Sequence, residues 1–162
     1  LLKQLNSTNM GYNNIGGSIS DLRYMPEISE FLIQHNNIEG TLPDLVGWPK
    51  LKSFHASNNK ITGTIPDFLE CLQQFYVDNN SLTGTIPNIE GVNLTQLNVQ
   101  NNQLTGTLPN IDNMDNLDQF IVYNNHLSGT ISDITAKKLS YFIIYGNNIE
   151  GSLPPVFNSP SL

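Results

Sequence analysis

The amino-acid sequence predicts an α/β solenoid, in which short repeats stack along one axis and each repeat buries its apolar face against its neighbours. The main observation is a pattern that returns about every 22 residues along the 162-residue chain. It is clearest from Leu51 to Pro66, where LKSFHASNNKITGTIP places apolar residues at regular intervals before an Asn, a Gly and an Ile-Pro pair. A fixed period of this size is typical of solenoids.

An asparagine at the end of each predicted strand marks seven repeats. It occurs at Asn13, Asn36, Asn59, Asn80, Asn102, Asn125 and Asn147. An amide side chain both donates and accepts hydrogen bonds, so a stacked column of amides would satisfy the backbone groups that the turn leaves unpaired. We therefore expect all seven asparagines to be structural. A glycine follows four residues after each one, where a positive φ or a close neighbouring backbone is expected.

Each repeat is expected to open with a short strand whose alternate residues point inward. In the third repeat Phe54 and Ala56 point inward, whereas His55 and Ser57 point outward. An aromatic column then runs through the core, comprising Phe31, Phe54, Phe75, Phe120 and Phe142 and interrupted by Leu97. In the first repeat, Leu2, Leu5, Thr8 and Met10 are the expected core positions.

The opposite side of each repeat is predicted to contain turns or 3₁₀ segments, because the repeats leave little room for longer helices. An Asp or Asn follows the Pro position and is expected to cap such a turn by accepting a backbone N–H. This column comprises Asp21, Asp44, Asp67, Asn88, Asn110 and Asp133.

These features resemble the plant-type leucine-rich repeat, L-x-x-L-x-L-x-x-N-x-L-x-G-x-I-P. The resemblance implies a horseshoe or superhelix with a parallel concave β-sheet and a convex side of 3₁₀ segments and turns, formed by residues 1–162 as one array of about seven repeats. Plant-type arrays usually carry paired cysteines in end caps, whereas this chain has the single Cys71. Because the pattern also continues to Leu162, we expect an excerpt of a longer array that lacks both caps.

Composition argues against several functions. Charged residues make up 13% of the chain, against about a quarter in typical soluble proteins, and the net charge is −7. The seven Lys and Arg residues form no basic stripe, so neither nucleic-acid binding nor attraction to anionic lipids is expected. Apolar runs stay well short of the roughly 20 residues of a membrane span, so this segment is not expected to insert into a membrane.

One set of residues, His55, Ser57 and Asp78, could be drawn as a catalytic triad. The sequence supplies neither a strained nucleophile turn nor oxyanion donors beside it, so a row of solvated side chains is the favoured interpretation and no enzymatic activity is predicted. The aspartates that follow the Pro column lie one per repeat, which suits caps better than a metal site. The chain also lacks the common nucleotide and metal motifs, and no cofactor is expected.

The outward side of the predicted strands is the candidate binding surface. Its middle is polar and rich in amides, whereas Ile and Tyr side chains gather on the last two strands. Tyrosine suits interfaces because it offers contact area and a polar tip at low entropic cost. Two alternative explanations of the Ile and Tyr cluster stay open. These residue types favour strands in any case, or another part of the full chain covers them. The candidate partner-binding residues are His55, Tyr76, Asp78, Gln100, Ile121, Tyr123, Tyr141, Ile143 and Tyr145.

The resemblance implies a non-enzymatic recognition module, similar to the ectodomains of plant receptor-like kinases and to the secreted polygalacturonase-inhibiting proteins. Such a module would be extracellular or at the cell surface and would bind a protein, peptide or glycan on its concave face. The alternative is a structural building block of an extracellular wall, sheath or filament, whose partners are other subunits. The repeated Thr-Gly-Thr gives a row of threonines at strand spacing, which resembles the rows of ice-binding solenoids. Ice binding is less favoured because Glu39 and Glu150 interrupt this row at its two ends.

Three Asn-x-Ser/Thr sequons, at Asn6, Asn79 and Asn93, are candidate N-glycosylation sites of a secreted protein. Asn79 lies beside the asparagine column near the concave rim. We therefore expect Asn6 and Asn93 to be the better acceptors.

Overall fold

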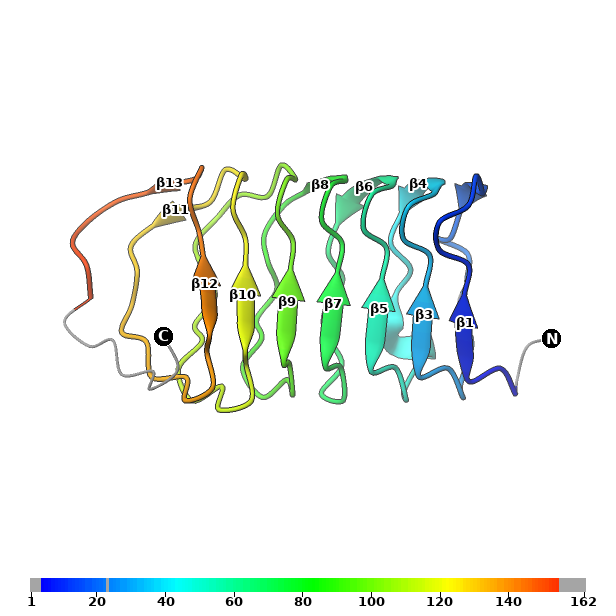
Figure 1. Ribbon diagram of the computed structural model, residues 1–162, viewed down its shortest axis with the longest axis horizontal. Helices are drawn as coiled ribbons and strands as arrows, with labels where there is room; N and C mark the ends of the chain where they lie inside the picture. The colour runs from blue at the N-terminus through cyan, green and yellow to red at the C-terminus, as the bar shows by residue number, and fades with distance from the viewer. Residues whose placement is uncertain (1–3, 23, 155–162) are drawn as a thin grey trace.

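Parallel strands stacked from consecutive repeats form the main sheet of the computed structural model, which describes residues 4–22 and 24–154 (Figure 1). Its seven strands follow one another in chain order, and neighbouring strands pair in parallel without a register shift, so that Phe54 lies beside Phe75. The predicted solenoid with a parallel sheet is thereby confirmed. The strands are β1 (Ser7–Asn9), β3 (Glu30–Leu32), β5 (Ser53–His55), β7 (Gln74–Tyr76), β9 (Gln96–Asn98), β10 (Gln119–Ile121) and β12 (Tyr141–Ile143).

A second series of short parallel strands follows the asparagine turns. Hydroxyl groups link its repeats: Thr62 Oγ1 donates to the Gly40 carbonyl at 3.1 Å, and Thr83 Oγ1 donates to the Gly63 carbonyl at 3.3 Å. The threonine row therefore serves packing between repeats. The series consists of a four-stranded sheet, β2 (Gly16–Ser18), β4 (Asn37–Thr41), β6 (Lys60–Thr64) and β8 (Ser81–Thr83), and a two-stranded sheet, β11 (Ser128–Gly129) and β13 (Asn148–Ile149).

The side opposite the main sheet contains turns and, within the described ranges, a single helix, the 3₁₀ helix η1 (Leu45–Gly47). Asp44 caps η1 by accepting the Val46 N–H at 3.0 Å. Asn88 and Asn110 accept the backbone N–H two residues later in the same way, at 3.0 and 2.9 Å, although no helix follows them. The predicted capping role is confirmed at these three positions.

The core contains the predicted aromatic column. The rings of Phe31 and Phe54 stack with centroids 5.8 Å apart, and those of Phe54 and Phe75 stack 5.5 Å apart. Trp48 is fully buried against Phe31 and Phe54, and its Nε1 donates to the Leu22 carbonyl at 3.1 Å. The column therefore helps to fix the register of the repeats by packing.

The first repeat is less buried than the sequence predicts. Met10 is 39% exposed and Thr8 is only partly buried, because β1 is an edge strand with a neighbour on one side. The expected core position Leu2 lies outside the described residues, as does Leu162, to which the repeat pattern extends. No helix among residues 4–22 and 24–154 has the length and hydrophobicity that a membrane span requires.

The asparagine column binds backbone groups of two repeats at once. Asn102 Oδ1 accepts the N–H of Leu82 at 2.9 Å, while its Nδ2 donates to the carbonyls of Val77 at 3.0 Å and Val99 at 3.1 Å. This pattern confirms the predicted structural role. The same bonds recur at Asn36, Asn59, Asn80, Asn125 and Asn147.

Candidate functional site

The candidate site is the solvent-facing side of the seven-stranded sheet, which we call the strand face and which corresponds to the predicted concave face. The nine candidate residues fall into two groups on it. His55, Tyr76 and Asp78 lie toward the N-terminal end, and Gln100 lies between the groups. The remaining five form the aromatic patch, which comprises Ile121, Tyr123, Tyr141, Ile143 and Tyr145.

The aromatic patch is carried by the adjacent strands β10 and β12 and by Tyr123 and Tyr145, which lie just beyond the ends of these strands. The rings of Tyr123 and Tyr145 stack with centroids 4.4 Å and planes 12° apart. Ile121 lies beside Ile143 in the sheet register, and Tyr141 and Tyr145 are 52% and 61% exposed. Desolvation and the adjacent Tyr123 phenol raise the pKa of Tyr145 above its ordinary value. The structure therefore brings the five residues together as one surface with a large accessible aromatic area.

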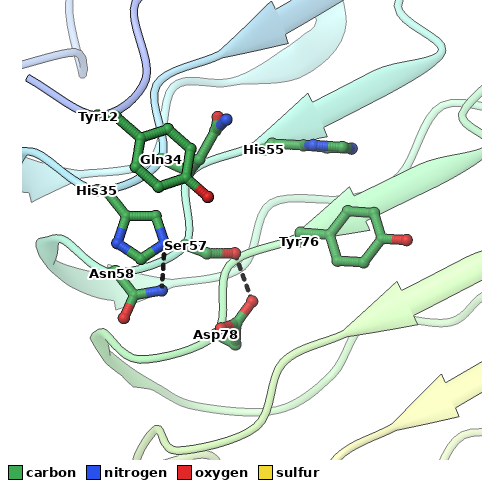
Figure 2. A pocket seen from close by; sticks show the side chains of 8 residues that line it. All are labelled: Tyr12, Gln34, His35, His55, Ser57, Asn58, Tyr76 and Asp78. Atoms are coloured by element: carbon green, nitrogen blue, oxygen red, sulfur yellow. Dashed lines mark hydrogen bonds between the residues drawn. The ribbon is translucent and has the colours of Figure 1, made fainter.

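A hollow of about 330 Å³ lies toward the N-terminal end of the strand face (Figure 2). We call it the N-terminal pocket. Its lining residues come from four consecutive repeats and include three of the candidates, His55, Tyr76 and Asp78. The full lining is Tyr12, Gln34, His35, His55, Ser57, Asn58, Tyr76 and Asp78.

Asp78 is more buried than its outward position in the sequence pattern suggests. It is 7% exposed, and its carboxylate accepts hydrogen bonds from Ser57 Oγ and, at 2.6 Å, from Asn79 Nδ2. Asn79 Oδ1 in turn accepts from Asn101 Nδ2 at 2.8 Å, and Asn101 Oδ1 accepts from Asn124 Nδ2 at 2.8 Å. A row of oriented amides therefore ends at this carboxylate. The successive hydrogen bonds of such a row polarise and strengthen one another.

In the row of His55, Ser57 and Asp78, the serine pairs with the aspartate and not with the histidine. The Ser57 hydroxyl donates to Asp78, and His55 Nε2 is shielded from solvent without a hydrogen-bond partner among the described residues. The His55 ring instead meets Tyr76 edge-on, with centroids 4.4 Å and planes 76° apart. The serine–histidine hydrogen bond of a catalytic triad is therefore not formed between Ser57 and His55.

Burial and nearby carboxylates set the electrostatics around the His55–Tyr76 pair. Burial lowers the pKa of His55, against the opposing effects of the Gln74 side chain and of the charges of Glu30 and Asp78. Burial also raises the pKa of Tyr76, with further contributions from Asp118 and Asp78. Three acidic side chains therefore act on this part of the strand face.

At the rim of the N-terminal pocket, unusual residue types occupy a left-handed backbone position that recurs in every repeat. The residue before each structural asparagine is left-handed, and at most repeats it is Asn or Gly, as at Asn58 with φ of 56°. Tyr12 and His35 occupy this position with φ of 56° and 53°. Their rings stack with centroids 4.4 Å and planes 16° apart, and Tyr12 is 73% exposed. A bulky residue in this region of φ is uncommon and usually has a specific reason.

Sequence reasoning missed Tyr12, Gln34, His35, Ser57 and Asn58 as lining residues of one pocket. Each belongs to an outward row of the predicted strands, but the rows alone do not show which neighbours enclose a hollow. A usable signal was present at Tyr12 and His35, which replace the Asn that precedes the structural asparagine in the four following repeats. That exception in the column points to this end of the array.

The three sequons differ in accessibility. Asn6 and Asn93 are exposed, and Asn93 Oδ1 accepts from Asn116 Nδ2 at 2.9 Å. Asn79 is partly buried and uses both atoms of its amide in the row that ends at Asp78. Among the described residues, no group of three or more His, Cys, Asp or Glu side chains is placed to hold a metal ion.

Comparison with known proteins identifies the repeats. The Leucine Rich Repeat family model matches residues 50–72 and 93–113, and no curated protein sequence matches the chain. The plant peptide hormone receptor RGFR1 in complex with RGF2 is similar over 94% of this chain and 30% of its own, with 28% identity and a TM-score of 0.79. The PEPR1–AtPEP1 structure is 31% identical over 94% of this chain and 23% of its own, with a TM-score of 0.86.

A third similar structure is the ectodomain of the Arabidopsis thaliana receptor kinase GASSHO1/SCHENGEN3 in complex with CASPARIAN STRIP INTEGRITY FACTOR 2. It is 27% identical, covers 94% of this chain and 19% of its own, and has a TM-score of 0.86. The chain thus spans less than a third of each of these three structures. The repeat pattern, the parallel sheet and these similarities together show that the chain carries leucine-rich repeats of the plant type.

Proposed function

We propose that this chain is a non-enzymatic recognition module, extracellular or at the cell surface, that binds an extended peptide segment of its partner on the strand face. The observation that carries the proposal is the aromatic patch, where Tyr123 and Tyr145 stack and Tyr145 remains 61% exposed. Exposed aromatic clusters of this kind are favoured contact points in interfaces. The similarity to RGFR1 in complex with RGF2 and to PEPR1–AtPEP1 supports a peptide as the partner.

The sheet geometry makes side chains, and not backbone groups, the recognition elements. Adjacent strands from β1 to β12 already pair with one another, so a peptide on the strand face meets side chains that recur once per repeat. Strands lie roughly 4.8 Å apart and an extended peptide rises about 3.3 Å per residue, so about nine peptide residues would cross the sheet. A short linear segment is therefore long enough to contact both the N-terminal pocket and the aromatic patch.

The test is a selection of peptides of about 12 residues from a random display library on the purified protein, a length that exceeds the span of the sheet. Affinities of the selected peptides are then measured by isothermal titration calorimetry. The double variant Tyr123→Ala/Tyr145→Ala is expected to weaken binding about tenfold or more, because it removes the stacked pair. An unchanged thermal unfolding midpoint would show that the fold is intact.

The matched control is Tyr24→Ala, which removes an equally exposed tyrosine, 64% accessible, from the segment between β2 and β3. It should bind the selected peptides as the unmodified protein does. Failure to enrich any peptide, or full affinity in the Tyr123/Tyr145 double variant, would contradict the proposal. Large regular assemblies in sedimentation of the protein alone would instead favour the structural building block.

A further inference from the structure

We propose that the N-terminal pocket binds the guanidinium group of an arginine side chain in the peptide partner. This inference rests on the proposed function and adds to it the side chain that is recognised and the place on the strand face where it is bound. Four properties of the pocket carry it, namely its acceptors, its charge, its aromatic walls and the strained backbone at its rim.

The Asp78 carboxylate provides acceptors in the pocket lining. The Asp78 carboxylate uses two of about four acceptor positions, for Ser57 and Asn79, and keeps the others. Because burial lowers the pKa of His55, its ring is neutral near pH 7 and does not repel a bound cation. A guanidinium, which has five donors and no acceptor, complements such a lining.

The charge around the pocket has the sign that attracts a cation. Asp78 lies in the lining, and Glu30 and Asp118 act on the adjacent His55–Tyr76 pair. The chain as a whole carries a net charge of −7. Asp78 is 7% exposed, so salt screens its interaction with a bound cation less than it would screen a surface pair. A carboxylate or phosphate guest would meet repulsion at the same place.

The walls of the pocket are aromatic and planar. The stacked rings of Tyr12 and His35 form one side, and Tyr76 lies across the opening from them (Figure 2). The planar guanidinium stacks on aromatic faces as well as forming hydrogen bonds, whereas the lysine ammonium acts as a compact point charge. This combination of flat walls with a carboxylate favours arginine over lysine.

Backbone strain at the rim points to the same residues. Tyr12 has a φ of 56° at the position where Asn79, Asn101 and Asn124 serve the fold with φ of 54°, 51° and 52°. Tyrosine is costly in this conformation, and Tyr12 is 73% exposed, so its ring adds little to the buried core. Strained residues of this kind cluster at ligand-binding sites.

The test uses N-acetyl-argininamide as the probe and N-acetyl-citrullinamide as its neutral control of equal shape. Titration of isotope-labelled protein, followed by NMR, is expected to shift the amide signals of Ser57, Tyr76 and Asp78 with the arginine compound. Its affinity should exceed that of the citrulline compound about tenfold, because citrulline lacks the charge that pairs with Asp78. N-acetyl-lysinamide should bind more weakly than the arginine compound.

Two variants locate the binding in the pocket. Asp78→Asn removes the charge, and Tyr12→Ala removes an exposed wall whose loss leaves the core untouched. Each should weaken binding of the arginine compound about tenfold, whereas Tyr24→Ala, outside the strand face, should leave it unchanged. Equal binding of the citrulline compound, or full affinity in Tyr12→Ala and Asp78→Asn, would overturn the proposal. Tighter binding of methyl glucoside than of the arginine compound would overturn it in favour of a sugar.

The failure of this inference differs from the failure of the proposed function. If selected peptides lose affinity in the Tyr123/Tyr145 double variant but show no enrichment of arginine and bind Asp78→Asn normally, the module stands and the arginine site is wrong. If the arginine compound binds in the pocket while no peptide is enriched, the arginine site stands and the peptide-binding module is wrong.

Discussion

The side-chain oxygen of Asn102 accepts a hydrogen bond from the backbone N–H of Leu82 in the preceding repeat, at 2.9 Å. Asn102 is 8% exposed, so water does not replace this bond when the amide is removed. The relationship shows how the repeats are joined, since one buried side chain satisfies backbone groups on both sides of a turn.

Replacing Asn102 with Ala should lower the free energy of unfolding by about 3 kcal/mol, because it leaves the Leu82 N–H and carbonyls such as those of Val77 and Val99 buried without their partner. Urea denaturation measures the change. Asn13→Ala is the control. Asn13 is exposed, and its amide donates to the Met10 and Gly11 carbonyls of its own turn. Equal losses in the two variants would refute a role that depends on burial.

Gly84 tests the close packing between repeats. It has a φ of 76°, and a Cβ there would lie 2.8 Å from Thr64 Cγ2. Gly84→Ala should therefore cost more than the about 1–2 kcal/mol expected for the backbone conformation alone. Gly91→Ala isolates that backbone effect, because Gly91 has a φ of 79° and no atom near the added Cβ. Adding Thr64→Ser, which deletes the methyl group, should reduce the loss toward that of Gly91→Ala in thermal unfolding.

His55 should make the stability depend on pH. Its pKa in the folded protein is lowered from 6.5 by burial, so the unfolded chain binds the proton more readily. The contribution of His55 to the free energy of unfolding is therefore fully present above pH 6.5, the ordinary pKa of the group. It is lost as the pH falls below 6.5, and the loss levels off below the lowered pKa of His55 in the folded protein. Urea denaturation between about pH 7 and pH 5 should show a flatter profile for His55→Gln. Replacing the exposed His126 by Gln should keep the profile of the unmodified protein.

Glycan occupancy should differ between the three sequons, because their asparagines differ in exposure and in hydrogen bonding. When the protein is secreted from eukaryotic cells, peptide mass mapping should find glycans at Asn6 and Asn93, which are exposed. Asn79 should remain unmodified, because its amide donates to Asp78 and accepts from Asn101. Occupancy of Asn79 with Asn93 empty would show that the folded structure does not determine acceptor choice.

The sequence by itself determined the repeating architecture. The period predicted the parallel strands, the Phe54–Phe75 stack, the bonds of the Asn102 column and the cap at Asp44, all of which are found in the structure. These features follow from local chemistry that recurs in each repeat, so that one clear example predicts the others. The pattern also placed the residues of the aromatic patch side by side, because residues one repeat apart in the sequence become neighbours on adjacent strands of the sheet.

Only the tertiary structure decided the depth of each side chain and the enclosure of the N-terminal pocket. The alternation of inward and outward residues along the strand places Asp78 on the outward side, yet Asp78 is only 7% exposed. Its carboxylate accepts hydrogen bonds from Ser57 of the preceding repeat and from its neighbour Asn79. The pocket depends on the left-handed backbone at Tyr12 and His35 and on how four repeats stand beside one another. Such enclosure arises from contacts between residues that are one repeat apart or more, which a pattern within a single repeat does not contain.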